Sequence, residues 1–132
     1  MKWNPILPAQ NSDTELWWDA TRSRRLILQR CKGCDHIQHY PRALCLACGN
    51  SDLAWKNSTG TGVLYSASTV LRSPDPHRFE TPYIVALVQL SEGPMLFTRL
   101  ISNDAYKLDM PVTIDWQPLE DGRHLPVFRP RL

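Results

Sequence analysis

Two C-x-x-C pairs constrain this chain more than any other feature of its sequence. Cys31 and Cys34 form the first pair, Cys45 and Cys48 form the second, and ten residues separate the two pairs. A segment this short cannot build a hydrophobic core of its own, so its fold depends on what the four sulfur atoms bind. In a reducing compartment, such closely spaced pairs bind metal more often than they form disulfides.

Four cysteines in two knuckles predict a tetrahedral metal site. The backbone amides of each knuckle can donate hydrogen bonds to the thiolates and keep them deprotonated. Zinc is the usual occupant of this spacing, although iron suits the same four-sulfur geometry. Because all four positions are filled by protein, we expect one structural Zn²⁺ with no open position for catalysis. A redox dithiol is the alternative, and it requires an exposed thiol of low pKa beside a helix start.

The two histidines between the knuckles, His36 and His39, are interpreted as surface or packing residues, because four cysteines already complete the ligand set. His77 and His124 are expected to lie in loops. We find no G-x-S-x-G elbow, Gly-rich phosphate loop or H-E-x-x-H helix. The sequence therefore predicts no catalytic residue.

The rest of the chain predicts one helix and several short strands. Ser12 and Glu15 have the spacing of a capping box, which favours a helix from about residue 13 to 24. Beyond residue 62 the pattern favours five strands, at 63–71, 83–90, 95–101, 112–116 and 125–128. The predicted fold is mainly β: an N-terminal helix, a rubredoxin-like zinc ribbon and a five-stranded OB-fold barrel. The predicted units are an extended segment with the helix (1–28), the ribbon (29–57) and the barrel (58–132).

Charge and hydropathy limit the classes of partner. Residues 63 to 132 carry seven basic and eight acidic side chains, whereas residues 1 to 62 carry eight basic and five acidic ones. A single-stranded nucleic-acid binder is the alternative function for a ribbon joined to an OB-fold, but it requires a positive groove. The longest apolar run, 83–88, is much shorter than a membrane helix, and the first residues do not resemble a signal peptide. We expect a cytoplasmic protein that binds neither membrane nor nucleic acid.

The outer face of one hairpin and the N-terminal tryptophans are both expected to contact something outside the barrel. The hairpin over 83–101 has one apolar face for the core, and its opposite face is also apolar, with Tyr83, Val85, Leu87, Met95 and Phe97. That face must be covered by the N-terminal helix, by the ribbon or by another protein. Tryptophan is enriched at interfaces, and three of the five tryptophans lie in the first 18 residues. The candidate docking residues are Trp3, Trp17 and Trp18.

The order of motifs resembles the DUF35 family of zinc-ribbon and OB-fold proteins. The matching stretches are "ELWWDATRSRRLILQRC", the ribbon with "YPRALCLAC", "GTGVLYSASTVLR", "PYIVALVQLSEG" and "PVFRPR". The resemblance covers nearly the whole chain. It implies a non-catalytic accessory subunit that binds a thiolase-like enzyme, a hydratase or an aldolase acting on acyl-CoA thioesters, and that contacts the CoA arm. Only the four cysteines transfer from the family by position.

If the chain contacts CoA, the phosphates require arginine or lysine, and the planar fork of arginine suits them best. The candidates lie near the ribbon and in the long proline-rich loop over 72–82, which we expect to face the partner or CoA. They are Arg22, Arg24, Arg25, Arg42, Arg72 and Arg78.

Overall fold

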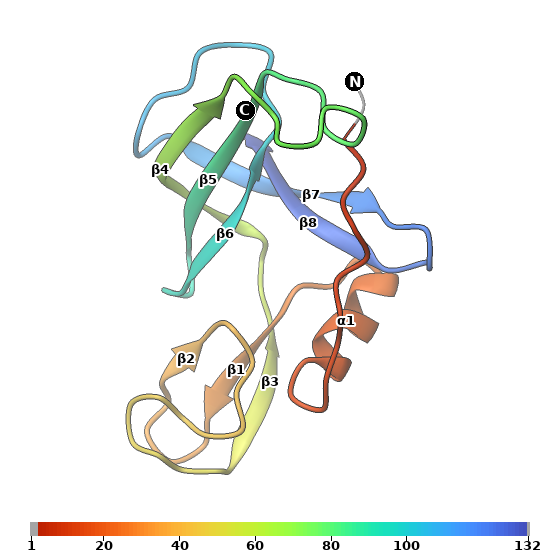
Figure 1. The fold of residues 1–132 in the computed structure, drawn as a ribbon. Coiled ribbons are helices and arrows are strands. Elements are labelled where there is room, and N and C mark those ends of the chain that lie inside the picture. The colour runs from red at the N-terminus through yellow and green to blue at the C-terminus, as the bar shows by residue number, and fades with distance from the viewer. Residues whose placement is uncertain (1–2, 132) are drawn as a thin grey trace.

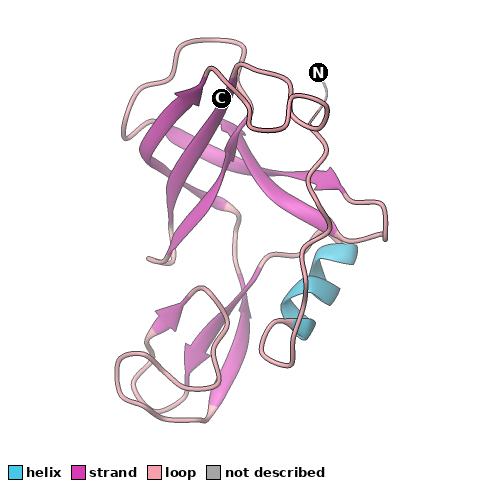
Figure 2. Ribbon diagram, in the orientation of Figure 1, coloured by secondary structure: helices cyan, strands magenta, loops and turns pink. Residues whose placement is uncertain are grey.

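The chain folds into a β-barrel with a smaller three-stranded sheet below it and one helix at the side (Figures 1 and 2). This computed structural model describes residues 3–131. The elements are α1 (Glu15–Arg22), β1 (Ile27–Cys31), β2 (Ile37–Gln38), β3 (Leu53–Asn57), β4 (Thr61–Val70), β5 (Tyr83–Leu90), β6 (Met95–Leu100), β7 (Pro111–Pro118) and β8 (His124–Pro130). The predicted fold class is confirmed. Within residues 3–131, no helix is long and apolar enough to cross a membrane.

Helix α1 begins differently from the prediction. The side-chain oxygen of Asn11 accepts hydrogen bonds from the backbone amides of Asp13 and Thr14, at 2.9 and 3.1 Å. The Asn11 carbonyl also accepts from the amide of Glu15, at 2.9 Å. The predicted capping box on Ser12 is therefore wrong: the N-cap is Thr14, which makes no side-chain cap hydrogen bond, and Asn11 orders the turn that precedes the helix. The helix is also shorter than predicted, and the chain turns at Arg24, which has a φ of 54°.

The ribbon sheet has the strand order β2-β1-β3, and both pairings are antiparallel. Two buried glutamines join it to the segment that carries the second cysteine pair. Gln38 donates from Nε2 to Gln29 Oε1 at 2.9 Å and to the Leu44 carbonyl at 3.1 Å. Gln29 in turn binds both the amide and the carbonyl of Arg42, at 2.8 Å each. These amide groups are buried but satisfied, so they hold the irregular segment against the sheet.

The barrel is closed in the order β4-β5-β6-β8-β7. Its one parallel pairing joins β6 to β8 at Leu100 and Phe128, while the other neighbours are antiparallel. A register shift between Leu64 and Ser66 bends β4. Gly62 allows close approach of β5, because a Cβ there would lie 2.3 Å from the Gln89 carbonyl oxygen. The predicted five strands and the β5–β6 hairpin are confirmed.

One core joins the helix, the ribbon and the barrel. Trp17 and Ala20 of α1, together with Leu28 of the ribbon, belong to the same buried cluster as Leu64 and Phe128 of the barrel. Beside this core, the His124 ring bonds the Thr21 carbonyl through Nδ1 at 2.8 Å. The expectation that His124 lies in a loop is wrong, because it begins β8 and fastens that strand to α1.

A buried arginine fastens the N-terminal segment. Arg123 is 4% exposed, and its Nε donates to Asp121 at 2.6 Å while Nη2 donates to the Pro8 carbonyl at 2.8 Å. Its guanidinium lies over the Trp18 ring, 4.9 Å from the centroid. The adjacent Arg123 also holds the pKa of Asp121 below its ordinary value through hydrogen bonds and charge, against the opposing effect of desolvation. The carboxylate therefore stays charged and paired.

Trp3 connects the N-terminal segment to the long loop after β4. Its ring contacts Phe79 and Tyr83, with centroids 5.2 and 6.0 Å apart, and the guanidinium of Arg99 lies 4.7 Å from it. Its carbonyl accepts a hydrogen bond from Gln117. Trp3 thus anchors the start of the described chain to the barrel.

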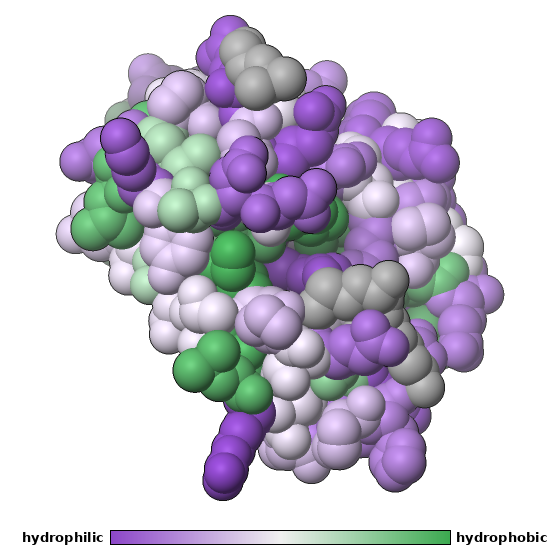
Figure 3. Space-filling model, turned by 90° about the horizontal axis from the view of Figure 1, so that it is seen from above, coloured by the Kyte–Doolittle hydropathy of each residue, from purple (hydrophilic) through white to green (hydrophobic). Residues whose placement is uncertain are grey.

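The loop end of the barrel lies at the top of Figure 1 and is seen from above in Figure 3. Apolar side chains gather toward the left and centre of that view, and hydrophilic ones dominate its right side. A cavity of about 530 Å³ opens among Tyr83, Ile84, Arg99 and the segment from Leu100 to Tyr106. Tyr106, at the end of this segment, and the nearby Met110 pack against the core.

Candidate metal centre

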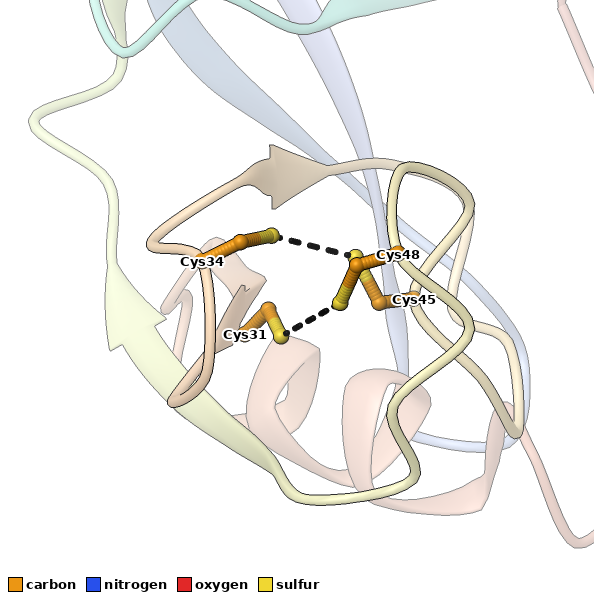
Figure 4. A group of neighbouring side chains, drawn as sticks. All are labelled: Cys31, Cys34, Cys45 and Cys48. Carbon is orange, nitrogen blue, oxygen red and sulfur yellow. Dashed lines mark hydrogen bonds between the residues drawn. The ribbon is translucent and has the colours of Figure 1, made fainter.

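The four cysteines converge on one point between β1 and the second knuckle (Figure 4). Their sulfur atoms all lie within 4.8 Å of one another. The Sγ atoms of Cys31 and Cys48 are 3.6 Å apart, and those of Cys34 and Cys45 are 3.7 Å apart. A disulfide bond is much shorter. Four sulfur atoms bound tetrahedrally to zinc at about 2.3 Å would be about 3.8 Å apart, so the geometry fits this ion.

Backbone amides complete the surroundings of the sulfur atoms. The amide of Gly33 donates to Cys31 Sγ at 3.3 Å, and the amide of Ala47 donates to Cys45 Sγ at 3.4 Å. At Gly33 a Cβ would lie 2.6 Å from the Asn50 side chain, so a larger residue would disturb the first knuckle. These amides stabilise thiolates, which are the form that binds metal.

Without a cation the cluster cannot ionise fully. Desolvation opposes ionisation of Cys45, but hydrogen bonds from the amides of Cys48 and Ala47, with those from the Cys34 and Cys48 side chains, lower the pKa of Cys45 to about 6. At Cys34 the amide of His36 lowers the pKa, yet desolvation and the neighbouring cysteines raise it to about 12. One thiolate forms readily and suppresses the next, so a divalent cation is required to balance the full set.

The two histidines between the knuckles lie outside this ligand set, as expected. His36 is exposed. His39 packs between Trp17 and Tyr40, with ring centroids 5.5 and 4.1 Å away. Within the described residues, neither ring nitrogen of His39 has a hydrogen-bond partner, and desolvation lowers its pKa to about 4. Nothing in its sequence context indicated this burial, which depends on α1 lying against the ribbon.

The six candidate arginines differ in position and in contacts. Arg22 donates to the Asp121 carbonyl at 2.7 Å, and Arg78 lies 3.5 Å from Asp75, so both already serve contacts within the chain. Arg42 and Arg72 are exposed at separate places, between the cysteine pairs and after β4. Only Arg24 and Arg25 share a pocket, of about 250 Å³, whose other lining residues are Leu26, Asn57, Ser58, Thr59, Ile114 and Trp116.

The three candidate docking tryptophans all pack against the chain itself. Trp17 is 6% exposed and belongs to the core, so the expectation that it docks a partner needs correction: its ring fills the junction of α1 with the ribbon. Trp18 is half-buried beneath Arg123, and Trp3 is half-buried against Phe79. The side chains of adjacent helical residues point about 100° apart, and here Trp17 and Trp18 both pack against other parts of the protein.

We predict that one zinc ion per chain is bound and that the ribbon depends on it. Replacement of one ligand, Cys45→Ser, should abolish stoichiometric zinc and unfold β1 to β3, because an incomplete set binds zinc weakly. Elemental analysis gives the zinc content, and backbone NMR spectra report the ribbon strands. His36→Asn, between the knuckles, is the matched control and should retain one zinc ion. Loss of zinc from the control instead would show that a histidine completes the site.

We predict that protonation of His39 destabilises the fold. Its pKa in the folded chain, about 4, lies below its ordinary value of 6.5, so the unfolded chain binds the proton more readily. Stability is therefore complete above pH 6.5 and falls as pH decreases from 6.5 toward 4, with a loss of about 1 kcal/mol by about pH 5.5.

Urea unfolding of the zinc-loaded protein at several pH values measures this effect. The variant His39→Phe keeps the ring contact with Trp17 and should lack this part of the pH dependence. His77→Gln, in an exposed loop, should behave like the wild type. Identical pH dependence in His39→Phe and wild type would contradict the assignment.

Two family models match consecutive parts of this chain. Residues 18–54 match a family model described as the ChsH2 rubredoxin-like zinc ribbon domain, and residues 55–117 match one described as the ChsH2 C-terminal OB-fold domain. Together with the converging sulfur atoms, the first match identifies a zinc ribbon whose four cysteines can hold one zinc ion.

Two curated relatives are similar over much of this chain. A probable enoyl-CoA hydratase alpha subunit from Thermomonospora curvata is 42% identical over 125 residues, which are 93% of this chain and 39% of the relative. A DUF35 domain-containing scaffold protein from Pyrococcus furiosus is 31% identical over 85 residues, which are 64% of this chain and 62% of the relative. The chain thus spans less than two thirds of the length of either relative.

Two solved structures share the fold. A chain of the structure described as "Ltp2-ChsH2(DUF35) aldolase" has a TM-score of 0.86 and 41% identity, with 96% of this chain and 100% of that chain covered. A DUF35 protein of unknown function from Sulfolobus solfataricus has a TM-score of 0.65 at 13% identity, over 92% of this chain and 87% of that chain. The second likeness concerns the fold alone. By the matched domains and the full-length similarity to a DUF35 chain, this protein belongs to the DUF35 family.

Proposed function

We propose that this protein is a non-catalytic accessory subunit of an enzyme that acts on acyl-CoA thioesters. The observation that supports this proposal most strongly is a similarity to the DUF35 component of a structure described as an aldolase, which extends over the full length of that component. The relative named as an enoyl-CoA hydratase subunit points to the same class of substrate. An aldolase or a hydratase is therefore the favoured partner, and a thiolase-like enzyme is a further candidate.

The chemistry of the described residues supports an accessory role. The four thiols are the zinc ligands, and zinc with four protein ligands has no position for substrate. His39 is buried and held neutral, and His124 is bonded to α1. The reacting groups would then come from the partner, while this chain supplies a rigid surface.

We propose the cytoplasm as the location, because zinc thiolates persist in a reducing compartment. The three-part division into residues 1–28, 29–57 and 58–132 is also kept as a proposal. It is supported by the gap between β3, which ends at Asn57, and β4, which begins at Thr61. Glu92 at the tip of the β5–β6 hairpin accepts from Ser58 and Thr59, at 2.9 Å each, and restrains this joint.

We further propose that the pocket beside Arg24 and Arg25 binds the phosphate end of CoA. Both arginines are exposed, and no acidic side chain among the described residues forms an ion pair with them. Two adjacent guanidinium groups suit phosphate oxygens. The Trp116 ring lines the same pocket and offers a flat surface on which an adenine can stack. The other four candidate arginines lack this combination.

Affinity capture tests the proposed function. The tagged full-length protein, expressed in its native organism, should recover an aldolase, hydratase or thiolase-like subunit in stoichiometric amounts, and the complex should turn over an acyl-CoA thioester. The recovered proteins are identified by mass spectrometry and turnover is followed by release of free CoA. Recovery of nucleic-acid-processing proteins without any acyl-CoA enzyme would contradict the proposal and favour the nucleic-acid alternative.

Calorimetric titration with CoA tests the pocket. The double variant Arg24→Ala/Arg25→Ala should weaken CoA binding by about 10- to 100-fold, because each charged hydrogen bond contributes about 1.5–3 kcal/mol and exposure to solvent reduces the total. The double variant Arg42→Ala/Arg72→Ala removes the same charge from other exposed positions and should bind CoA nearly as the wild type does. Equal losses in the two variants would mean that net charge, and not this pocket, attracts CoA.

A further inference from the structure

The walls of the barrel differ in charge. The 24 residues of β4, β5 and β6 include one charged side chain, that of Arg99, and the Trp3 ring lies over it. The opposite wall, formed by β7 and β8, carries Asp115 and Arg129, which lie 3.8 Å apart across the strand pair. The second wall has a charged pair, as expected of a solvent-facing sheet, whereas the described strands of the first carry a single charged side chain.

The outward side chains at the middle of β4 to β6 form one surface of aromatic, aliphatic and small hydroxyl groups without charge. Ala86, Val88 and Leu96 are buried in the core, so the alternating residues of these strands point outward. Leu87 pairs with Phe97 on β6 and with Ser66 on β4, which places the three side by side. We call this surface the uncharged wall and define it by Tyr65, Ser66, Ser68, Val85, Leu87 and Phe97.

The surface of the uncharged wall is uneven. Phe97 is 60% exposed and Tyr65 is 53% exposed, which is high for large apolar side chains. A shallow groove of about 150 Å³ runs beside Phe97, along the small side chains of Ser66, Ala67 and Ser68. A protruding aromatic side chain next to a groove is typical of the core of a protein interface.

Within residues 3–131, the helix, the ribbon and the N-terminal segment leave this wall uncovered. Helix α1 packs on β8 and β1, and the N-terminal segment reaches only the Tyr83 and Arg99 end of the β5–β6 pair. Figure 1 shows α1 on the side of β7 and β8, away from β4 and β5, with the ribbon below the barrel. Of the three covers expected from the sequence, the helix and the ribbon are therefore engaged elsewhere, which leaves another protein.

We infer that the uncharged wall is the docking surface for the acyl-CoA enzyme subunit, an inference that rests on the proposed function. The lack of charge on the wall limits the chemistry of this partner surface. A partner that presented charged groups here would bury them without a counter-charge, which costs several kcal/mol per ion in proteins. The matching patch on the enzyme is therefore uncharged and apolar, with a side chain that enters the groove beside Phe97. Nucleic acid does not fit, because the wall offers no cation for phosphates.

The test introduces a charge at the centre of the wall. In the complex recovered by affinity capture, Phe97→Glu should weaken binding of the enzyme subunit by at least about 30-fold, as expected at the core of an interface. The matched control, Thr113→Glu, places the same charge on the opposite wall beside Arg129 and should bind like the wild type. Biolayer interferometry with purified subunits measures both affinities, and zinc content with thermal unfolding confirms that each variant is folded.

The outcomes separate this inference from the proposed function. If wild type and Phe97→Glu bind the enzyme equally, the enzyme docks elsewhere and the inference is wrong, while the proposed function stands. If the wild type binds no acyl-CoA enzyme, both are wrong. If light scattering shows a dimer that Phe97→Glu dissociates, with unchanged enzyme binding, the wall is covered by a second copy and the inference is wrong. Should Phe97→Glu fail to fold, the smaller change Phe97→Ser, with an expected loss of about 10-fold, decides the same question.

Discussion

The tetrahedral set of four thiolates is the constraint on which the rest of the structure depends. Strand β2 has two residues and β1 and β3 have five each, so the ribbon sheet is too small to be stable through apolar burial. Zinc bound by the four cysteines would join β1 to the segment between β2 and β3, and the buried pair of Gln29 and Gln38 joins them through hydrogen bonds. With the segment held in this way, the ribbon presents an ordered surface to α1.

That surface allows the ribbon and the barrel to share a core. Trp17 lies against His39 of the ribbon and within the buried cluster that includes Phe128 of the barrel. On the outer side of α1, Arg123 binds the Pro8 carbonyl and covers the Trp18 ring. Contacts on both sides of the helix thus join α1, the ribbon and the barrel into one unit. A surface held on such a unit suits the proposed accessory role, because a partner would be bound in a defined position.

The proposed roles occupy different parts of this unit. The pocket with Arg24 and Arg25 lies where the turn after α1 meets the joint between ribbon and barrel. The uncharged wall belongs to β4, β5 and β6, on the side of the barrel away from α1. A partner on that wall and CoA in the pocket would not compete for the same residues, so protein docking and ligand binding are separable by mutation.

The sequence by itself determined the zinc ligands, the five barrel strands and the apolar outer face of the hairpin over 83–101, because cysteine spacing and strand alternation are local patterns. Only the tertiary structure decided which side chains those elements bring together. Arg24 and Arg25 meet Trp116 from the far end of the chain, and Trp17 is buried because the ribbon and the barrel close over it. Helix α1 starts after a turn ordered by Asn11 and not at a cap on Ser12, and the ring nitrogens of His39 are shielded from water, through backbone geometry and long-range packing that no local pattern contains.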